Sequence, residues 1–286
     1  MSQPVISFGQ QPCGFFPKRF LYAKIYSARK LQARIGGRIV FFYHDSDADY
    51  RETITVLRDI RSGAEVRLNF LQPNKIQKKF SPLYAKRIAA GWQEEMIRQL
   101  PRFIPLEARR LRRLPRLWRG PLTGFMDARS PLIGLFASIN QETVADFCLE
   151  MYRKMGLLEG IEIVRSGDRA VRERAPDIDE FYADIEYKGE VVRALREKGR
   201  FILHEGGGKI ITLPDQPVEK YQKSPGRDLR FFWMQSVIGC THYVMGASET
   251  QYLDRAAFPE VKFVPRDSIP EPEYAWINDP TTPLNT

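Results

Sequence analysis

The N-terminal part of the chain alternates between short apolar runs and one long amphipathic segment. Residues 5–8 form an apolar run that predicts a strand, and residues 17–35 carry apolar side chains at helical spacing. Gly36 and Gly37 are expected to end that helix. Residues 38–43 are then almost continuously apolar, which is typical of a strand buried on both faces of a parallel sheet. Strand, helix and strand in this order predict a right-handed parallel βαβ unit.

A similar alternation returns near the C-terminus. Residues 228–238 predict a helix, residues 241–245 a strand, residues 247–256 a helix and residues 261–264 a further strand. The last 22 residues contain five prolines, which predicts an irregular surface segment. Both ends of the chain therefore carry α/β patterning.

The middle of the chain separates these two α/β segments. Residues 84–100 and 141–155 predict amphipathic helices, and residues 188–213 predict a short helix followed by a hairpin that turns at Gly206–Gly208. We therefore expect an α/β fold with a Rossmann-like parallel sheet that a mainly helical insertion interrupts. The expected boundaries are 1–75 for the first half of the core, 76–225 for the insertion with its small hairpin, and 226–286 for the second half and the tail.

Composition and cysteine usage narrow the class of protein. The chain has 286 residues, of which 43% are hydrophobic and 28% charged, which suits a domain with a sizeable core. The apolar run at residues 131–139 is too short to span a bilayer, and the N-terminus shows no signal-peptide pattern. The three cysteines are far apart and predict neither a disulfide framework nor a zinc module. We expect a reduced, cytoplasmic protein without a membrane partner.

The net charge of +9 is concentrated in residues 102–119, which hold seven arginines against Glu107. Such a segment suggests a phosphate-bearing partner, either a nucleotide or a nucleic acid. Leucines interleave with the arginines, so a solvated face on a packed segment is the more ordinary interpretation. A non-catalytic nucleotide- or RNA-binding protein remains the alternative function, and its candidate residues are Arg109, Arg110, Arg112 and Arg113.

Two segments follow predicted strands, where α/β sheets bind their ligands. Gly9, Gln10, Gln11 and Gly14 lie between the first strand and the first helix, where glycines let the backbone approach a ligand. A plain strand-to-helix turn is the competing interpretation, and the spacing is not that of a Walker loop. The second segment is an acidic turn at residues 44–49, which could hold an ammonium group, a ribose or Mg²⁺, or be an exposed turn.

Several other motifs do not indicate a particular catalytic or binding function. The three histidines have no metal-ligand spacing, and no serine lies in a Gly-x-Ser-x-Gly elbow. The triple glycine before Lys209 is not followed by a predicted helix, so a hairpin turn is favoured over a phosphate loop. These observations favour neither a hydrolase nor a metalloenzyme.

Both ends of the chain resemble the bacillithiol synthases, the cysteine-adding enzymes of bacillithiol biosynthesis. The loop Gly9-Gln10-Gln11-Pro12-x-Gly14-Phe15 is similar to the family's Gly-Gln-Gln-x-Gly-Leu/Phe, and Lys24, Ser27 and Ala28 resemble its Tyr-Lys-x-x-Ser-Ala. Asp47-x-Asp49-Tyr50 resembles the family's Glu-Asp-His-Asp-Phe turn, with Ala48 where the family has His. Near the end, Tyr243-Val244-x-Gly246-x-x-Glu249-x-x-Tyr252 and Val264-Pro265-Arg266-x-Ser268 resemble two further segments.

The resemblance covers about a third of the chain, and the coiled-coil region of the family is absent from this sequence. It implies a core like that of class I aminoacyl-tRNA synthetases and nucleotidylyl transferases. It also implies an ATP-dependent ligase that joins an amino-acid carboxylate such as that of cysteine to an amine such as an amino sugar. A scaffold that kept only the fold is the third alternative.

Under the ligase hypothesis, Asp47 and Asp49 are the expected catalytic residues, since they would hold an ammonium group or Mg²⁺. ATP or ADP and Mg²⁺ are the expected cofactors, and the partners are small-molecule substrates. The residues expected to bind nucleotide or substrate are Gly9, Gln10, Gln11, Gly14, Lys24, Tyr243, Gly246 and Glu249.

Overall fold

The computed structural model describes residues 3–59, 61–104 and 131–267 of the chain. Its centre is a parallel sheet with the order β13-β12-β1-β2-β6. This mixed α/β arrangement confirms the expectation of a Rossmann-like parallel sheet. In chain order the strands are arranged 3-2-1-4-5, as in dinucleotide-binding folds. The strands are β1 (Val5–Gln10), β2 (Arg38–Tyr43), β6 (Ile161–Arg165), β12 (His242–Met245) and β13 (Lys262–Pro265).

The predicted βαβ unit is confirmed. Helix α1 (Arg19–Ile35) connects β1 to β2, which pair in parallel from Val5 opposite Arg38 to Gln10 opposite Tyr43. Gly36 follows the helix with a φ of 72°, a left-handed conformation that suits glycine. The apolar run of β2 is buried on both faces of the sheet, as its pattern predicts.

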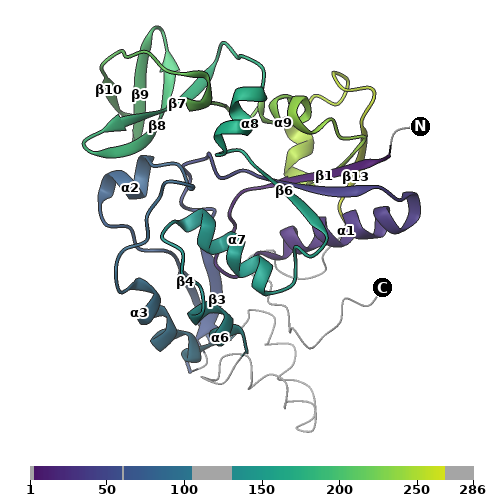
Figure 1. Ribbon diagram of the computed structural model, residues 1–286. Helices are drawn as coiled ribbons and strands as arrows, with labels where there is room; N and C mark the ends of the chain where they lie inside the picture. The colour runs from purple at the N-terminus through teal and green to yellow at the C-terminus, as the bar shows by residue number, and fades with distance from the viewer. Residues whose placement is uncertain (1–2, 60, 105–130, 268–286) are drawn as a thin grey trace.

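Helices cover both faces of the parallel sheet. In Figure 1, α8 (Arg169–Arg174) and α9 (Arg230–Ile238) lie above the sheet, and α1 and α7 (Val144–Lys154) lie below it. Side chains of β2 alternate between the two sides. Phe41 packs in the hydrophobic cluster that includes α1 and α7, whereas Phe42 packs in the cluster with α9. The fold is therefore three-layered.

The middle of the chain differs from the expected insertion in two ways. Residues 161–165 form β6, which pairs with β2 and so belongs to the parallel sheet rather than to the insertion. The described residues also contain a five-stranded antiparallel sheet with the order β10-β9-β8-β7-β11, where only a small hairpin was expected beside the helices. Its strands are β7 (Phe181–Tyr187), β8 (Glu190–Glu197), β9 (Arg200–Gly206), β10 (Lys209–Leu213) and β11 (Lys223–Pro225).

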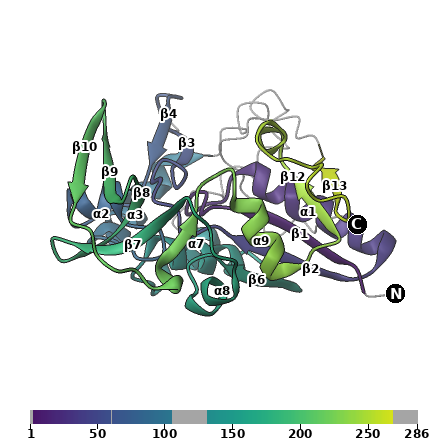
Figure 2. The same ribbon diagram turned by 90° about the horizontal axis from the view of Figure 1, so that it is seen from above.

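The antiparallel sheet lies at the end of the molecule away from β13, as both views show (Figures 1 and 2). The helix expected near residue 188 was wrong, because β8 alternates buried and exposed positions and packs against α2 (Lys75–Phe80). The predicted hairpin is confirmed as β9 and β10, with positive φ angles at Gly206–Gly208.

Two further helix predictions were too long. Within residues 84–100, only α3 (Trp92–Gln99) is an α-helix, because the preceding backbone pairs with other segments: the Ile88 amide donates to the Glu142 carbonyl and the Ala89 amide to the Leu71 carbonyl. Within residues 247–256, only a 3₁₀ turn, η4 (Ala247–Gln251), forms. The remaining elements are β3 (Thr55–Asp59), β4 (Glu65–Leu68), η1 (Leu100–Arg102), β5 (Phe103–Ile104), α6 (Pro131–Ala137) and η3 (Lys220–Gln222).

Several expectations concern other parts of the chain. Arg109, Arg110, Arg112 and Arg113, together with the proline-rich tail, lie outside the described residues. Cys13, Cys148 and Cys240 are buried free thiols, as expected from their spacing. Among the described helices, none is both long and apolar enough to cross a bilayer.

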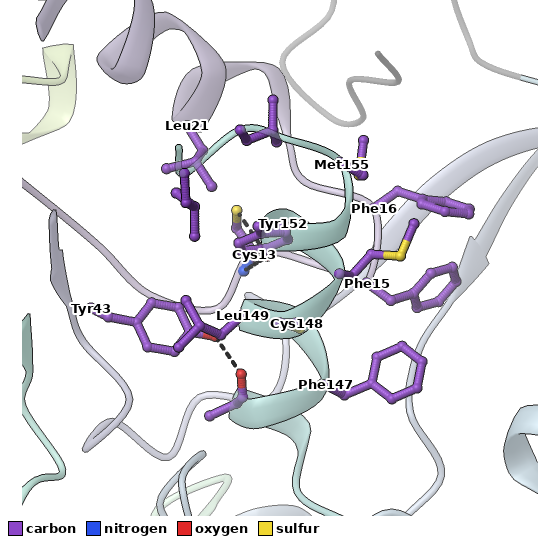
Figure 3. Close-up of a cluster of buried hydrophobic side chains, with 14 of the residues drawn as sticks. Cys13, Phe15, Phe16, Leu21, Tyr43, Phe147, Cys148, Leu149, Tyr152 and Met155 are labelled. Carbon is purple, nitrogen blue, oxygen red and sulfur yellow. Dashed lines mark hydrogen bonds between the residues drawn. The ribbon is translucent and has the colours of Figure 1, made fainter. Parts of the chain in front are cut away.

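Tyr152 on α7 fixes the loop that follows β1 (Figure 3). Its buried hydroxyl accepts a hydrogen bond from the Cys13 amide at 3.0 Å and donates one to the Gly14 carbonyl at 2.7 Å. Gly14 has a φ of 102°, and a Cβ there would lie 2.7 Å from Thr55 Oγ1. The glycine and the tyrosine therefore set the loop conformation together.

We expect Tyr152→Phe to lower the free energy of unfolding by about 1–3 kcal/mol, because it leaves a buried amide and a buried carbonyl without a partner. Urea denaturation checks this value. Tyr26→Phe on α1 is the control, since Tyr26 is 40% exposed, and equal stabilities of the wild type and Tyr152→Phe would contradict the assignment.

Candidate functional site

A cleft of about 700 Å³ opens at the carboxyl ends of β1, β2 and β12. The strand order reverses between β1 and β12, and open α/β sheets bind ligands in the crevice at such a switch point. Helices α1 and α9 supply side chains from opposite sides of the sheet. Of the residues that the sequence singled out, the lining includes Gly9, Gln10, Gln11, Lys24, Asp47, Asp49, Tyr243, Gly246 and Glu249.

Gly14 is the one predicted site residue that does not line this cleft. Its carbonyl is bound by Tyr152, and its backbone turns the chain towards α1. Gly14 thus shapes the loop, and the expectation that it contacts a ligand stays a prediction. A glycine that a turn requires and a glycine that a ligand requires look the same in a sequence.

Lys24 and Glu249 form an ion pair across the floor of the cleft. Lys24 Nζ lies 2.6 Å from Glu249 Oε2, and the two side chains are only 5% and 13% exposed. Lys24 also donates to the Gly9 carbonyl at 2.8 Å, while Glu249 accepts from the Tyr243 hydroxyl at 2.7 Å and from the Gly246 amide. These contacts join α1, β1 and the segment after β12 at the switch point.

The acidic turn after β2 divides into a buried part and a part that faces the cleft. Asp45 is fully buried and binds Arg165 Nε at 2.6 Å and the Gly167 amide at 2.7 Å, so its carboxylate anchors the turn to β6. Lys86 is also buried and donates to the Ala48 carbonyl at 3.0 Å. Burial lowers the pKa of Lys86 to about 7. These contacts leave Asp47 and Asp49 directed to the cleft.

Asp47 connects two sides of the cleft. Its Oδ2 accepts from Gln11 Nε2 at 2.6 Å and from Arg230 Nη2 at 2.7 Å, while Oδ1 accepts from the Ala48 amide. Burial alone would raise the pKa of Asp47, but the guanidinium groups of Arg193 and Arg230 lower it below its usual range. Asp47 is therefore an anion at neutral pH that holds the loop after β1 against α9.

The Asp49 carboxylate accepts three hydrogen bonds from the Arg51 guanidinium, at 2.8, 3.2 and 2.7 Å, and Arg51 is exposed. The two carboxylates that face the cleft are thus both paired with arginines, Asp47 with Arg230 and Asp49 with Arg51. Among the described residues there is no group of three or more His, Cys, Asp or Glu side chains that could hold a metal ion. The acidic turn therefore does not fit a protein-held Mg²⁺ site.

His44 is the first residue after β2 and lines the cleft, with 8% of its surface exposed. Its ring packs edge-on against Phe42, and in the described part of the chain no hydrogen bond joins either ring nitrogen to the protein. Burial, followed by the charges of Arg230 and Lys24, holds the pKa of His44 well below 6.5. The imidazole is therefore neutral at physiological pH and presents an unoccupied nitrogen lone pair.

This neutral histidine predicts a pH-dependent stability. Because the pKa of His44 is lower in the folded state than in the unfolded state, the unfolded state takes up a proton first as the pH falls below about 6.5. We expect the free energy of unfolding of the wild type to fall relative to that of His44→Gln between pH 7.5 and 5, as urea denaturation at several pH values can measure. A constant difference between the two proteins across this range would contradict the prediction.

Sequence reasoning missed Arg230, and it considered His44 only as a member of the acidic turn. Arg230 lies at the start of α9, far along the chain from Asp47, and no motif surrounds it. The charge complementarity of an acidic turn and a basic helix start was the only available signal.

Comparisons with families and curated proteins do not show the family of this chain. No protein-family model matches the chain. A search of the curated proteins also returns no match.

Proposed function

We propose that the protein is an ATP-dependent ligase-like enzyme that joins an amino-acid carboxylate to an amine. The observation that carries this proposal is the cleft at the β1–β12 switch point, where the residues that resemble bacillithiol synthases meet. Gly9 and Gln11 come from one end of the chain and Gly246 and Glu249 from the other. The resemblance therefore concerns one contiguous surface.

The basic side chains of the cleft support binding of a phosphate-bearing substrate, beside four carboxylates, Asp47, Asp49, Glu52 and Glu249, that also line it. Its lining includes Lys24, Arg227, Arg230 and Arg266, three of which come from the C-terminal half of the chain. Arginine and lysine side chains bind phosphate oxygens with charge-assisted hydrogen bonds. Gly9 and Gly246 line the cleft at the ends of β1 and β12, where the proposed nucleotide would bind. ATP is the expected phosphate donor at this surface.

Glu249 is the expected contact for a ribose or a substrate hydroxyl. A carboxylate offers about four lone-pair positions, and Lys24, Tyr243 and the Gly246 amide occupy three of them. One acceptor position is left for a ligand. Because these three hydrogen bonds fix its orientation, the Glu249 carboxylate suits the positioning of a substrate more than proton transfer.

The proposed chemistry has two steps, by analogy with class I synthetases. ATP first converts the amino-acid carboxylate, such as that of cysteine, into a mixed anhydride with phosphate or AMP. The amine of an amino sugar then displaces the phosphate-bearing group to form an amide. Separation of the charged substrates from bulk water in the cleft strengthens the electrostatic interactions that hold them.

The test uses ATP, L-cysteine and hydroxylamine, because hydroxylamine captures an activated carboxylate as a hydroxamate. We expect hydroxamate formation that requires both ATP and the amino acid. Calorimetric titration with ATP and with ADP, with and without magnesium, should show saturable one-to-one binding. Absence of hydroxamate with each of the common amino acids, together with absence of nucleotide binding, would overturn the proposal.

A further inference from the structure

Two ion pairs of the cleft differ in how firmly they are held. The side chains of Lys24 and Glu249 are only 5% and 13% exposed. Lys24 also donates to the Gly9 carbonyl, and Glu249 accepts two further hydrogen bonds. Arg230 Nη2 and Asp47 Oδ2 lie 2.7 Å apart, but each of these side chains is 20% exposed. A ligand that enters the cleft therefore reaches the Arg230–Asp47 pair more readily.

Arg230 uses little of its hydrogen-bonding capacity on the protein. Its Nη2 donates to Asp47 Oδ2, and within residues 3–59, 61–104 and 131–267 no other group accepts from the guanidinium. A guanidinium carries five N–H donors in one plane, and two of them can bind a phosphate group side by side. Because Arg230 lines the cleft and is partly exposed, its remaining donors are available to a phosphate there.

A phosphate bound to Arg230 would lie beside the Asp47 carboxylate. Asp47 is an anion at neutral pH, and its Oδ2 accepts from the same guanidinium. Like charges at hydrogen-bonding distances repel strongly where water is largely excluded. A phosphate oxygen therefore competes with Asp47 for Arg230.

Asp47 keeps two other partners when it leaves Arg230. Gln11 Nε2 donates to its Oδ2 at 2.6 Å, and the positive charge of Arg193 on β8 also acts on the carboxylate. Arg193 is held in place, since its Nη2 donates to the Pro225 carbonyl at 2.7 Å. The second cation thus remains near Asp47 while Arg230 changes its partner.

We propose that Arg230 binds the phosphate chain of the nucleotide in exchange for Asp47, so that nucleotide binding breaks the Asp47–Arg230 pair. The inference rests on the proposed function, because it takes the ligand of the cleft to carry phosphate. It adds a competition between a carboxylate of the protein and the phosphate of the ligand. Since Asp47 belongs to the turn after β2, the exchange couples nucleotide binding to the conformation of that turn.

The two partners of the pair should change nucleotide affinity in opposite directions. Asp47→Asn keeps the shape and an acceptor oxygen but removes the competing charge. We expect its Kd for ATP, measured by calorimetric titration, to fall by about 10-fold or more, because Arg230 no longer has to be released from an anion. Arg230→Met removes the phosphate contact and should raise the Kd by about 10- to 100-fold. Inorganic triphosphate should show both shifts, because the contact does not involve the nucleoside.

Arg230→Lys is a second variant of the same position. It keeps the positive charge without the planar fork, so its affinity should lie between those of the wild type and Arg230→Met. The double variant Asp47→Asn with Arg230→Met should bind like Arg230→Met alone, because no guanidinium is left for which the anions compete.

The pair of Arg196 and Asp215 supplies the matched controls. Arg196 Nη1 lies 2.6 Å from Asp215 Oδ1, and neither residue lines the cleft. Asp215→Asn and Arg196→Met should therefore leave the affinity for ATP and for triphosphate unchanged. Melting curves of all variants confirm that the affinities are those of folded protein.

The outcomes separate this inference from the proposed function. Weaker binding in both Asp47→Asn and Arg230→Met would overturn the exchange, because it would show that the pair only supports the site. An unchanged affinity in either variant would overturn it as well. Absence of hydroxamate in the wild type would count against the proposed function instead, and the triphosphate titration then still decides the exchange. Absence of binding of both ATP and triphosphate to the wild type would overturn the exchange.

Discussion

Replacing Lys24 by Met is expected to lower the free energy of unfolding by about 3–5 kcal/mol, the cost of removing one partner from a buried ion pair. The change leaves Glu249 as a carboxylate that is largely buried, and it leaves the Gly9 carbonyl without its ammonium donor. The segment after β12 then loses its connection to α1. Chemical denaturation measures the loss, and ATP binding should weaken in parallel because the floor of the cleft is no longer held.

The control for this prediction lies on the same helix. Lys30 pairs with Asp267 at 3.4 Å, but the Lys30 side chain is 64% exposed, so Lys30→Met should cost less than about 1 kcal/mol. The double variant Lys24→Met with Glu249→Gln should be more stable than the sum of the single changes predicts, because the unpaired carboxylate is gone. Strict additivity, or equal effects of Lys24→Met and Lys30→Met, would show that the pair does not hold the site.

Replacing Asp47 by Ala is expected to reduce ATP-dependent turnover by about 100-fold or more while the protein stays folded. Asp47 is the shared acceptor of Gln11 and Arg230, so its loss releases both the loop after β1 and the start of α9. A misplacement of about 1 Å in a substrate-positioning group can cost about 100-fold in rate. The variant also leaves Arg230 as an uncompensated cation near His44.

The measurements for Asp47→Ala are the rate of hydroxamate formation and the melting curve. Asp215→Ala is the matched control, because Asp215 pairs with Arg196 at 2.6 Å in the same type of Asp–Arg contact but lies in an exposed position away from the cleft. Arg230→Met should reproduce the defect of Asp47→Ala, and the double variant should be no worse than either single change if the pair acts as a unit. Turnover that survives in Asp47→Ala would remove its proposed role.

The parallel sheet could be predicted because its local patterns are unambiguous. The nearly continuous apolar run of β2 requires burial on both faces, and the amphipathic helix before it can lie on only one side of a sheet. The antiparallel sheet could not be predicted in the same way. Residues of β8 carry charged side chains at several positions, including Arg193 and Arg196, so the apolar spacing is weak.

The difference between local patterns and long-range contacts also explains which residues of the cleft could be predicted. Gly9 lies at the end of β1, while Gln11, Asp47 and Glu249 follow strands, and the sequence marks the ends of strands through turn residues. Arg230 comes from an ordinary helix, and its function depends on a carboxylate far away along the chain. The pair of Asp47 and Arg230 produces no pattern in the sequence, because it forms only when folding brings the two segments to one edge of the sheet.

The sequence by itself determined the α/β class, the first βαβ unit and the glycine- and carboxylate-containing segments that follow strands, since these depend on hydrophobic periodicity and local backbone preference. Tertiary structure decided which of these residues meet. It placed Gly14 in a structural turn, paired Asp47 with Arg230, and packed the His44 ring directly against Gly9. The physical reason is that hydrogen bonding and charge pairing act between atoms a few ångströms apart, whereas the sequence orders residues only along the chain.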